Sequence, residues 1–125
     1  PIASSAASDV YKRQVAGSKG LSNHEAISAA KSGIEGFARS AAATYAKDNL
    51  RVNVIAPSIM DSNMSEKILS SDAAREVSKN MHPISKIGDA DDILPVIKWL
   101  LSPDAKWVTG QTIHVDGGLS TVKPR

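Results

Sequence analysis

The spacing of apolar positions predicts a long helix at the start of the regular part of the chain. From Ser22 to about Lys47, apolar residues recur at steps of three and four, as they do on one face of an α-helix. Ser22 and Glu25 have the spacing of a capping box, and Asp48-Asn49 provide a stop. The apolar stripe is mainly alanine and comprises Ala26, Ile27, Ala30, Ile34, Phe37, Ala38, Ala41 and Tyr45. Small side chains allow another element to approach closely, so we expect an interior or interface helix.

Two short apolar segments have the character of strands. Residues 51–56 are rich in β-formers and stop at Pro57, which predicts a buried strand followed by a loop through Asp61. Residues 112–115 predict a second strand, closed by a turn at Asp116-Gly117-Gly118. We interpret this turn as structural, with lining of a site as the alternative.

Two more helices are predicted between these strands. Residues 64–80, capped by Asp61 or Ser62, form a polar-faced pattern that is typical of a lid rather than of a core. Its thin apolar edge consists of Met64, Ile68, Leu69, Ala73 and Val77. Residues 91–101 predict an apolar helix with two aspartates in its first turn, where they are favourable against the helix dipole. Pro95 is expected to fall within that first turn and to be tolerated there.

The order helix, strand, helix, helix, strand is that of an α/β protein. Two strands joined through helices should lie parallel under a right-handed crossover. Two strands are too few for a doubly wound sheet, so we expect the remaining strands upstream of this sequence. The fold class predicted for residues 15–125 is therefore the C-terminal half of one doubly wound, parallel-sheet, Rossmann-like α/β domain.

Composition narrows the classes of function. The net charge is only +2, and the basic residues are scattered among acids, so we expect no nucleic-acid partner. No stretch of about eighteen apolar residues predicts a membrane span. The absence of cysteine excludes disulfides and thiolate chemistry and, with no secretion signal at the start, favours a cytoplasmic location. His82 and His114 lack clustered carboxylates, so no metal site is predicted.

Residues 1–14 do not fit the pattern of the rest of the chain. The hexapeptide at 9–14, DVYKRQ, is the translation of the end of a widely used sequencing adaptor. We therefore expect residues 1–14 to be an artefactual lead-in to a truncated reading frame, to be left out of fold reasoning. The alternative is a natural basic turn at a frayed terminus. Re-amplification of the locus from source DNA distinguishes the two.

Five segments between residues 15 and 118 resemble the short-chain dehydrogenase/reductase family. They are AAKSGIEGFARS (29–40), LRVNVIAP (50–57), IGDADDI (87–93), TGQT (109–112) and VDGG (115–118). Each segment alone is weakly specific, but their order and spacing together are typical of this family. The resemblance implies a Rossmann-type fold, a nicotinamide cofactor and hydride transfer to or from a carbonyl or alcohol.

The family's catalytic pair is only half present. In this family a tyrosine and a lysine four residues later share one helical face, where the ammonium lowers the phenol pKa and holds the nicotinamide ribose. Lys31 matches the lysine and is implied as a catalytic and cofactor-binding residue, with an exposed pair to Glu35 as the alternative. The tyrosine position is Ile27, and Gln14 stands where the family places a serine.

His24 is the one candidate to replace the missing acid. It precedes Ile27 by three residues and Lys31 by seven, so all three share a helical face, and histidine commonly acts as an acid near neutral pH. The positive end of the helix favours neutral imidazole, which donates a hydrogen bond but is a weak acid catalyst. The alternative is a histidine that contacts only solvent or backbone.

The loop after the first strand is implied as a second cofactor contact. The family uses a Pro-Gly pair there, followed by a threonine that reaches the nicotinamide carboxamide. The matching cofactor-binding candidates are Pro57, the Ile59 backbone and the Ser62 hydroxyl, with helix capping as the alternative for Ser62. Ser58 replaces the glycine and removes its freedom to take a positive φ, so we expect a slightly different loop.

Three functions remain open from the residues. The leading one is an NAD- or NADP-dependent oxidoreductase acting on a small-molecule carbonyl or alcohol, and the choice of coenzyme lies upstream, in the expected glycine-rich turn. The second is a catalytically silent dinucleotide-binding sensor or scaffold, which Ile27 supports. The third is a helix-packing module. The resemblance also implies a homodimer or homotetramer through the alanine-rich helix, whose face from Ala26 to Ala46 allows close approach, and Ala38 and Ala42 are its expected contact residues.

Overall fold

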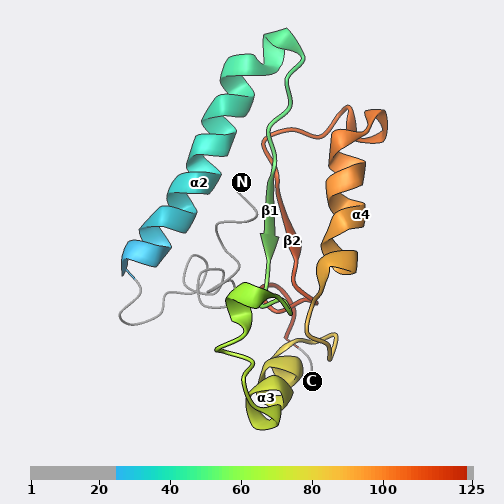
Figure 1. Ribbon diagram of the computed structural model, residues 1–125. Coiled ribbons are helices and arrows are strands. Elements are labelled where there is room, and N and C mark those ends of the chain that lie inside the picture. Colours follow the sequence, from blue (N-terminus) through green and yellow to red (C-terminus); the bar gives the residue numbers. More distant parts are fainter. Residues whose placement is uncertain (1–24, 124–125) are drawn as a thin grey trace.

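The computed structural model describes residues 25–123 (Figure 1). Its elements follow the predicted α/β order and are α2 (Glu25–Tyr45), the 3-10 helix η2 (Ala46–Asp48), β1 (Val54–Pro57), the 3-10 helix η3 (Asn63–Ser65), α3 (Asp72–Met81), α4 (Ala90–Leu101), the 3-10 helix η4 (Pro103–Ala105) and β2 (Thr112–Val115). The predicted cap Ser22, the candidate acid His24 and the lead-in 1–14 lie outside the described residues.

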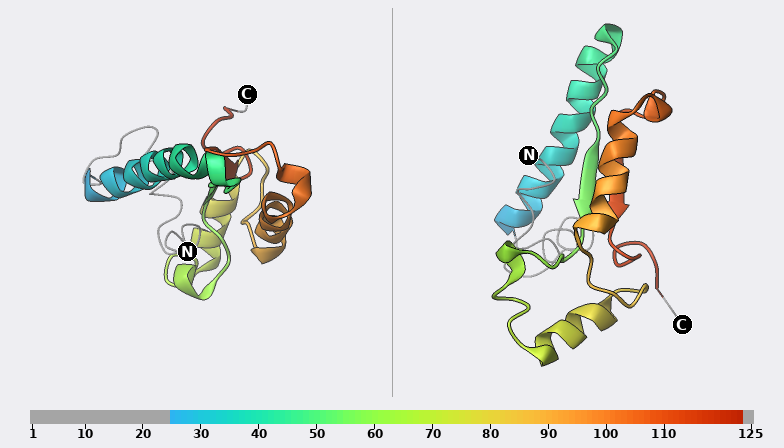
Figure 2. Two further views of the ribbon diagram at one scale, coloured as in Figure 1. Left: turned by 90° about the horizontal axis from the view of Figure 1, so that it is seen from above. Right: turned by 45° about the vertical axis from the view of Figure 1, so that its right-hand side comes forward.

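The two strands pair side by side and run parallel, as predicted. Val54 lies opposite Thr112, and Pro57 lies opposite Val115. Helix α2 covers one side of the pair and α4 the other, as seen from the front and from above (Figures 1 and 2). A parallel sheet between two helical layers is the architecture expected for part of a doubly wound domain.

The regular pairing of β1 begins later than predicted, at Val54 rather than at residue 51. Before that point, one backbone bond joins the two chain segments, from the Gly110 N–H to the Val52 carbonyl over 2.7 Å, and side chains add further bonds. The Asn53 side-chain amide donates to the Val108 carbonyl over 3.0 Å, and its oxygen accepts from the Gln111 backbone N–H over 3.1 Å. The Val52 N–H donates to the Thr109 hydroxyl over 3.1 Å. Side chains that bond to backbone groups supplement the backbone bonds here, which β-propensity alone does not reveal.

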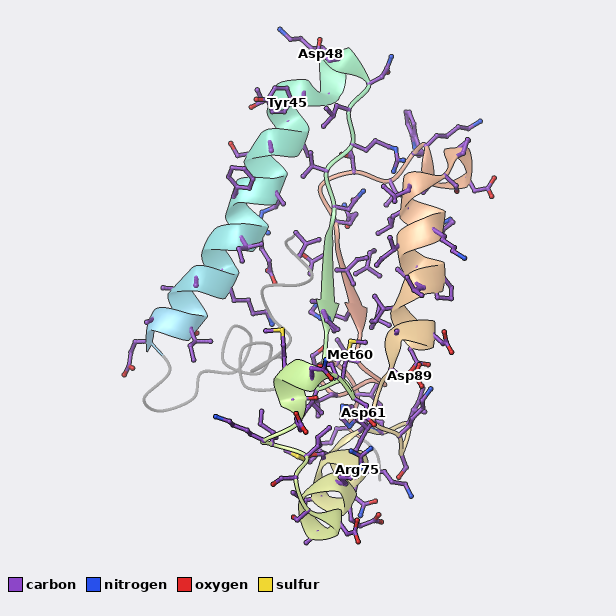
Figure 3. All side chains as sticks on the ribbon, viewed as in Figure 1. Tyr45, Asp48, Met60, Asp61, Arg75 and Asp89 are labelled. Atoms are coloured by element: carbon purple, nitrogen blue, oxygen red, sulfur yellow. The ribbon has the colours of Figure 1, made fainter. Side chains whose placement is uncertain are left out.

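Helix α2 approaches the sheet through alanines. Ala38 and Ala42 are buried, and a Cβ placed on Gly110 would lie 3.6 Å from the Ala42 Cβ. Several members of the predicted stripe are instead exposed, among them Phe37 at 66% and Tyr45 at 48%. Phe37 is turned about 100° from its neighbour Ala38, and Tyr45 lies in the last turn of the helix, level with the chain that leads into β1 (Figure 3). The buried stripe is therefore narrower than the apolar one.

The helix predicted over residues 64–80 is wrong in its first half. The chain forms η3 and a series of turns before α3 begins at Asp72. Ser71 caps α3 because its hydroxyl accepts from the Ala74 amide over 3.1 Å. Serine side chains compete with helical backbone bonding, so the Ser70-Ser71 pair breaks the apolar periodicity.

The N-terminus of α4 was predicted one residue too late. Asp89 is the cap, and its carboxylate accepts from the amides of Asp91 and Asp92 at 2.9 and 3.3 Å. Pro95 is therefore the sixth helical residue and lies outside the first turn, contrary to the prediction. Its missing N–H would have bonded the Asp91 carbonyl, and Asp91 is exposed, so water can donate in its place.

The isolated 125-residue chain is expected to be marginally stable and prone to associate. Within the described part, β1 and β2 form a two-stranded sheet, which is rarely stable alone and leaves backbone groups open to pairing with another chain. Sedimentation velocity should show association, and heating should show a broad transition. A monomer with one cooperative thermal transition would contradict this expectation.

Candidate active site

The candidate site lies where the two parallel strands end. Both strands point toward η3 and α3, and the N-terminal part of α2 lies at the same end of the molecule (Figures 1 and 2). Lys31 comes from that part of α2, and the loop of Pro57, Ile59 and Ser62 follows β1. In doubly wound folds, ligands bind outside the carboxyl ends of the strands. The loop after β1 therefore lies at the expected edge, and its sharing of one site with Lys31 stays a prediction.

Lys31 is a half-buried cation on α2. Burial lowers the pKa of its ammonium from the ordinary value, while the negative charges of Glu35 and Asp116 act in the opposite direction. Asp116 directly follows β2, so a negative charge at the end of the sheet acts on the Lys31 ammonium of α2. The charge of Glu35 acts on Lys31 as the alternative of a pair expects, and the cofactor role of Lys31 stays a prediction.

Ile27 lies one turn before Lys31 on α2 and is partly buried. A spacing of four residues puts the two side chains on one helical face. At the position where the resemblance implies a tyrosine, the chain therefore has an aliphatic side chain, which neither donates nor accepts a proton. The acid role of His24 remains a prediction.

The loop after β1 is tightly held. Ser58 and Ile59 are buried, Met60 pairs with Gly88 as an isolated parallel bridge, and the Asp61 amide donates to the Gly88 carbonyl over 2.7 Å. Among described residues other than glycine, a positive φ occurs at Asn49 alone. Ser58 thus forms this loop without the backbone conformation for which a glycine would be needed.

Ser62 is the N-terminal cap of η3, and helix capping was its alternative to a cofactor contact in the sequence analysis. Its backbone N–H donates to the Ser65 hydroxyl over 3.1 Å, and the two hydroxyls lie 3.4 Å apart at the start of η3. Ser65 is fully buried and also donates to the carbonyls of Met60 and Ser62. Ser65 therefore organises this loop, and no periodic signal in the sequence marked it.

A polar hollow of about 590 Å³ lies beside this loop. It is lined by Asp61, Ser62, Asn63, Glu66, Leu69, Ser70 and Arg75. Arg75 of α3 donates to the Asp61 carboxylate over 2.6 Å, and both side chains are about half exposed (Figure 3). The hydrogen bond and charge of Arg75 lower the pKa of Asp61. Sequence analysis missed this pair because its members are fourteen positions apart on different elements.

The turn after β2 is built around the Asp116 carboxylate. Asp116 is buried and accepts from the amides of Gly118 and Ser120 at 2.9 and 3.0 Å. Burial raises the pKa of this carboxyl, but hydrogen bonds from Ser120 and Gly118 and the charge of His114 outweigh it, so the pKa lies below the ordinary value. These contacts support the interpretation of this turn as structural.

Residues 25–123 lack two further features: a cluster of metal ligands and a helix able to span a membrane. In that part of the chain, no group of three or more histidines and acids is placed to hold a metal ion. The helices of the same part include none with the length and apolarity required to cross a bilayer.

Comparison with known proteins decides the family. A family model described as "Enoyl-(Acyl carrier protein) reductase" matches residues 1–120. The chain belongs to the short-chain dehydrogenase/reductase family. The Rossmann-type fold of that family's members is the arrangement seen around β1 and β2.

Members of the short-chain dehydrogenase/reductase family match along most of the chain. A 3-oxoacyl-[acyl-carrier-protein] reductase of Haemophilus influenzae is 37% identical over 105 residues, which are 84% of this chain and 43% of that protein. A tropinone reductase homolog of Arabidopsis thaliana is 33% identical over 117 residues, which are 94% of this chain and 36% of the relative. The chain thus spans about two fifths of the length of these curated relatives.

Solved structures of the family superpose well on the chain. A 4-hydroxyisoleucine dehydrogenase complexed with NADH gives a TM-score of 0.75 at 26% identity, over 90% of this chain and 45% of that one. A short-chain type dehydrogenase/reductase from Mycobacterium ulcerans gives 0.75 at 28% identity, over 85% and 38% of the two chains.

Proposed function

We propose that the full-length protein binds NAD or NADP at the carboxyl ends of β1 and β2 and transfers hydride between nicotinamide and a small-molecule carbonyl or alcohol. The observation that carries this proposal is the half-buried Lys31 in the N-terminal part of α2, at the same end of the molecule as the carboxyl ends of the strands. Family membership supports the same activity, and so does the NADH-bound relative.

The residues present fit a nicotinamide dinucleotide. When bound, the nicotinamide ring supplies a hydride acceptor or donor. Lys31 offers a charged donor for ribose hydroxyls, and Pro57 and Ile59 form a rigid wall after β1. The Ser62 hydroxyl lines the adjoining polar hollow and would contact the carboxamide beside its role at η3. We expect the residues that select NAD or NADP to lie in the part of the domain that this chain does not span.

A second candidate function rests on Ile27. A family member without the tyrosine would bind the dinucleotide as a sensor or scaffold and transfer hydride poorly, because a branched alkyl group cannot protonate a developing alkoxide. Dinucleotide binding without turnover is the signature of this alternative.

Titration of the full-length protein with NADH and with NADPH, followed by nicotinamide fluorescence, tests the proposal. Saturable binding of one coenzyme and its oxidation in the presence of a carbonyl panel are expected for the oxidoreductase. Binding with no turnover would favour the silent member. Failure of the folded protein to bind either coenzyme would contradict both functions.

We also propose that the full-length protein is a homodimer or homotetramer that uses the outer face of α2. Ala38 and Ala42, the contact residues expected from the sequence, do not suit this interface because both are buried within the chain itself. A glutamate at either position would disrupt folding rather than assembly. Phe37 is two-thirds exposed on the same helix and provides the apolar contact.

Phe37→Asp in the full-length protein should lower the mass measured by light scattering. A carboxylate in the centre of a symmetric contact is desolvated and lies near its own copy, which opposes association. Val77→Asp is the matched control, since Val77 is similarly exposed but lies on α3. An unchanged mass for Phe37→Asp would exclude this face as the interface.

A further inference from the structure

A buried chain of hydrogen bonds connects the β1 loop to helix α3. Ser58 and His82 are 2% and 4% exposed. The Nε2 atom of His82 lies 2.8 Å from the Ser58 hydroxyl, and its Nδ1 atom lies 2.7 Å from the Ser78 carbonyl oxygen. Both ring nitrogens are therefore within hydrogen-bond distance of a partner, and each partner belongs to a different segment of the chain.

The chemistry of the partners assigns the direction of each bond. A carbonyl oxygen only accepts, so Nδ1 carries the proton and donates to Ser78. In neutral imidazole the other nitrogen is then an acceptor, and the Ser58 hydroxyl donates to Nε2. The assignment follows from the bonding network and uses every polar atom of the ring.

His82 stands where three segments meet. It is the C-terminal cap of α3, and its backbone N–H donates to the Lys79 carbonyl over 3.2 Å. A Cβ placed on Gly117, in the turn after β2, would lie 3.5 Å from the His82 Cβ. Ser58 brings the third segment, the loop after β1. The three segments also line a hollow of about 210 Å³.

Helix α3 has little apolar surface to hold it in place. Its one buried residue is Ser78, and Val77 is 62% exposed. Two polar links join α3 to the β1 loop: the buried one through Ser58 and the exposed Asp61–Arg75 pair (Figure 3). Exposed ion pairs contribute little to stability, whereas buried polar groups that lose a partner are costly. The buried link should therefore dominate.

We propose that Ser58 and His82 are positioning residues that hold α3 and the β1 loop in one arrangement, so that the dinucleotide meets a preformed wall at Ile59. The effect on cofactor affinity rests on the proposed function, whereas the mechanical link between loop and helix does not. Ser58 then has a role of its own: in place of the family's glycine it provides the hydroxyl that His82 requires.

Two substitutions at position 82 separate the two bonds. Asparagine can reach the Ser78 carbonyl from the place of Nδ1, and glutamine can reach the Ser58 hydroxyl from the place of Nε2. In the full-length protein, His82→Asn and Ser58→Ala are expected to raise the dissociation constant of NADH by about three- to tenfold, the range of one neutral hydrogen bond. His82→Gln should stay within about twofold of the parent, and Ser85→Ala, an exposed serine, is the matched control.

Amide hydrogen exchange provides the readout that does not depend on cofactor. His82→Asn and Ser58→Ala should lose protection in α3 and in the β1 loop together, and the double variant should be no worse than either single one, because both remove the same bond. Retained protection in both single variants, or additive losses in the double variant, would overturn the link. If exchange changes as expected but no form of the protein binds dinucleotide, the proposed function fails and the link stands.

Discussion

Replacing Ile27 with tyrosine in the full-length protein is expected to raise the rate of carbonyl reduction by about a hundred- to ten-thousandfold, the usual contribution of a positioned general acid. Ile27 lies one helical turn before Lys31 and is partly buried. A phenol at this position would lie near the Lys31 ammonium, which lowers a phenol pKa and favours proton transfer near neutral pH. The measurement is coenzyme oxidation at saturating carbonyl substrate.

Ile27→Phe is the control for this gain, since it supplies the ring without the hydroxyl. It should leave turnover at the level of the parent, and Lys31→Met combined with Ile27→Tyr should lose the gain. If tyrosine brings no improvement while His24→Ala abolishes turnover, His24 has taken over the acid role. That outcome would contradict the alternative in which His24 contacts only solvent or backbone.

Lys31→Met in the full-length protein should raise the dissociation constant of the nicotinamide dinucleotide about tenfold to hundredfold. Loss of one charge-assisted hydrogen bond costs about 1.5 to 3 kcal/mol. Methionine keeps the length of the side chain and tolerates half-burial, so packing of α2 should be preserved. Fluorescence titration of NADH measures the change.

Lys47→Met is the matched control for Lys31, because Lys47 is an exposed lysine in η2 at the far end of the same helical segment. Its removal should leave coenzyme affinity unchanged, which separates a local contact from a general effect of net charge. If Lys31→Met binds as tightly as the parent, Lys31 does not belong to the site.

Local patterns predicted much of the scaffold. The period of α2, the end of α4 at Leu101 and the strand at 112–115 follow from residues that are near one another in sequence. The parallel pairing of the strands followed from the element order, because a crossover through helices leaves few topologies. The residues of the resemblance also predict Lys31 and the β1 loop as parts of one cofactor site.

Pairs that are distant in sequence were decided by the tertiary structure. Asp61 and Arg75 are fourteen positions apart, and Ser58 and His82 are twenty-four apart. Neither pair leaves a periodic trace, because a hydrogen bond between two elements depends on how those elements pack. For this reason the sequence did not predict the bond between His82 and Ser58.

By itself, the sequence determined the order of most helices and of both strands, and it named the candidate groups of the site, because both depend on short-range periodicity and on motif spacing. Only the tertiary structure decided which of these groups are buried and what each one bonds. Ala38 and Ala42 are buried on the side of the chain's own sheet while Phe37 is exposed, and Ser62 caps η3. Burial and partner choice are properties of packed surfaces, and they arise when elements that are far apart in the sequence meet.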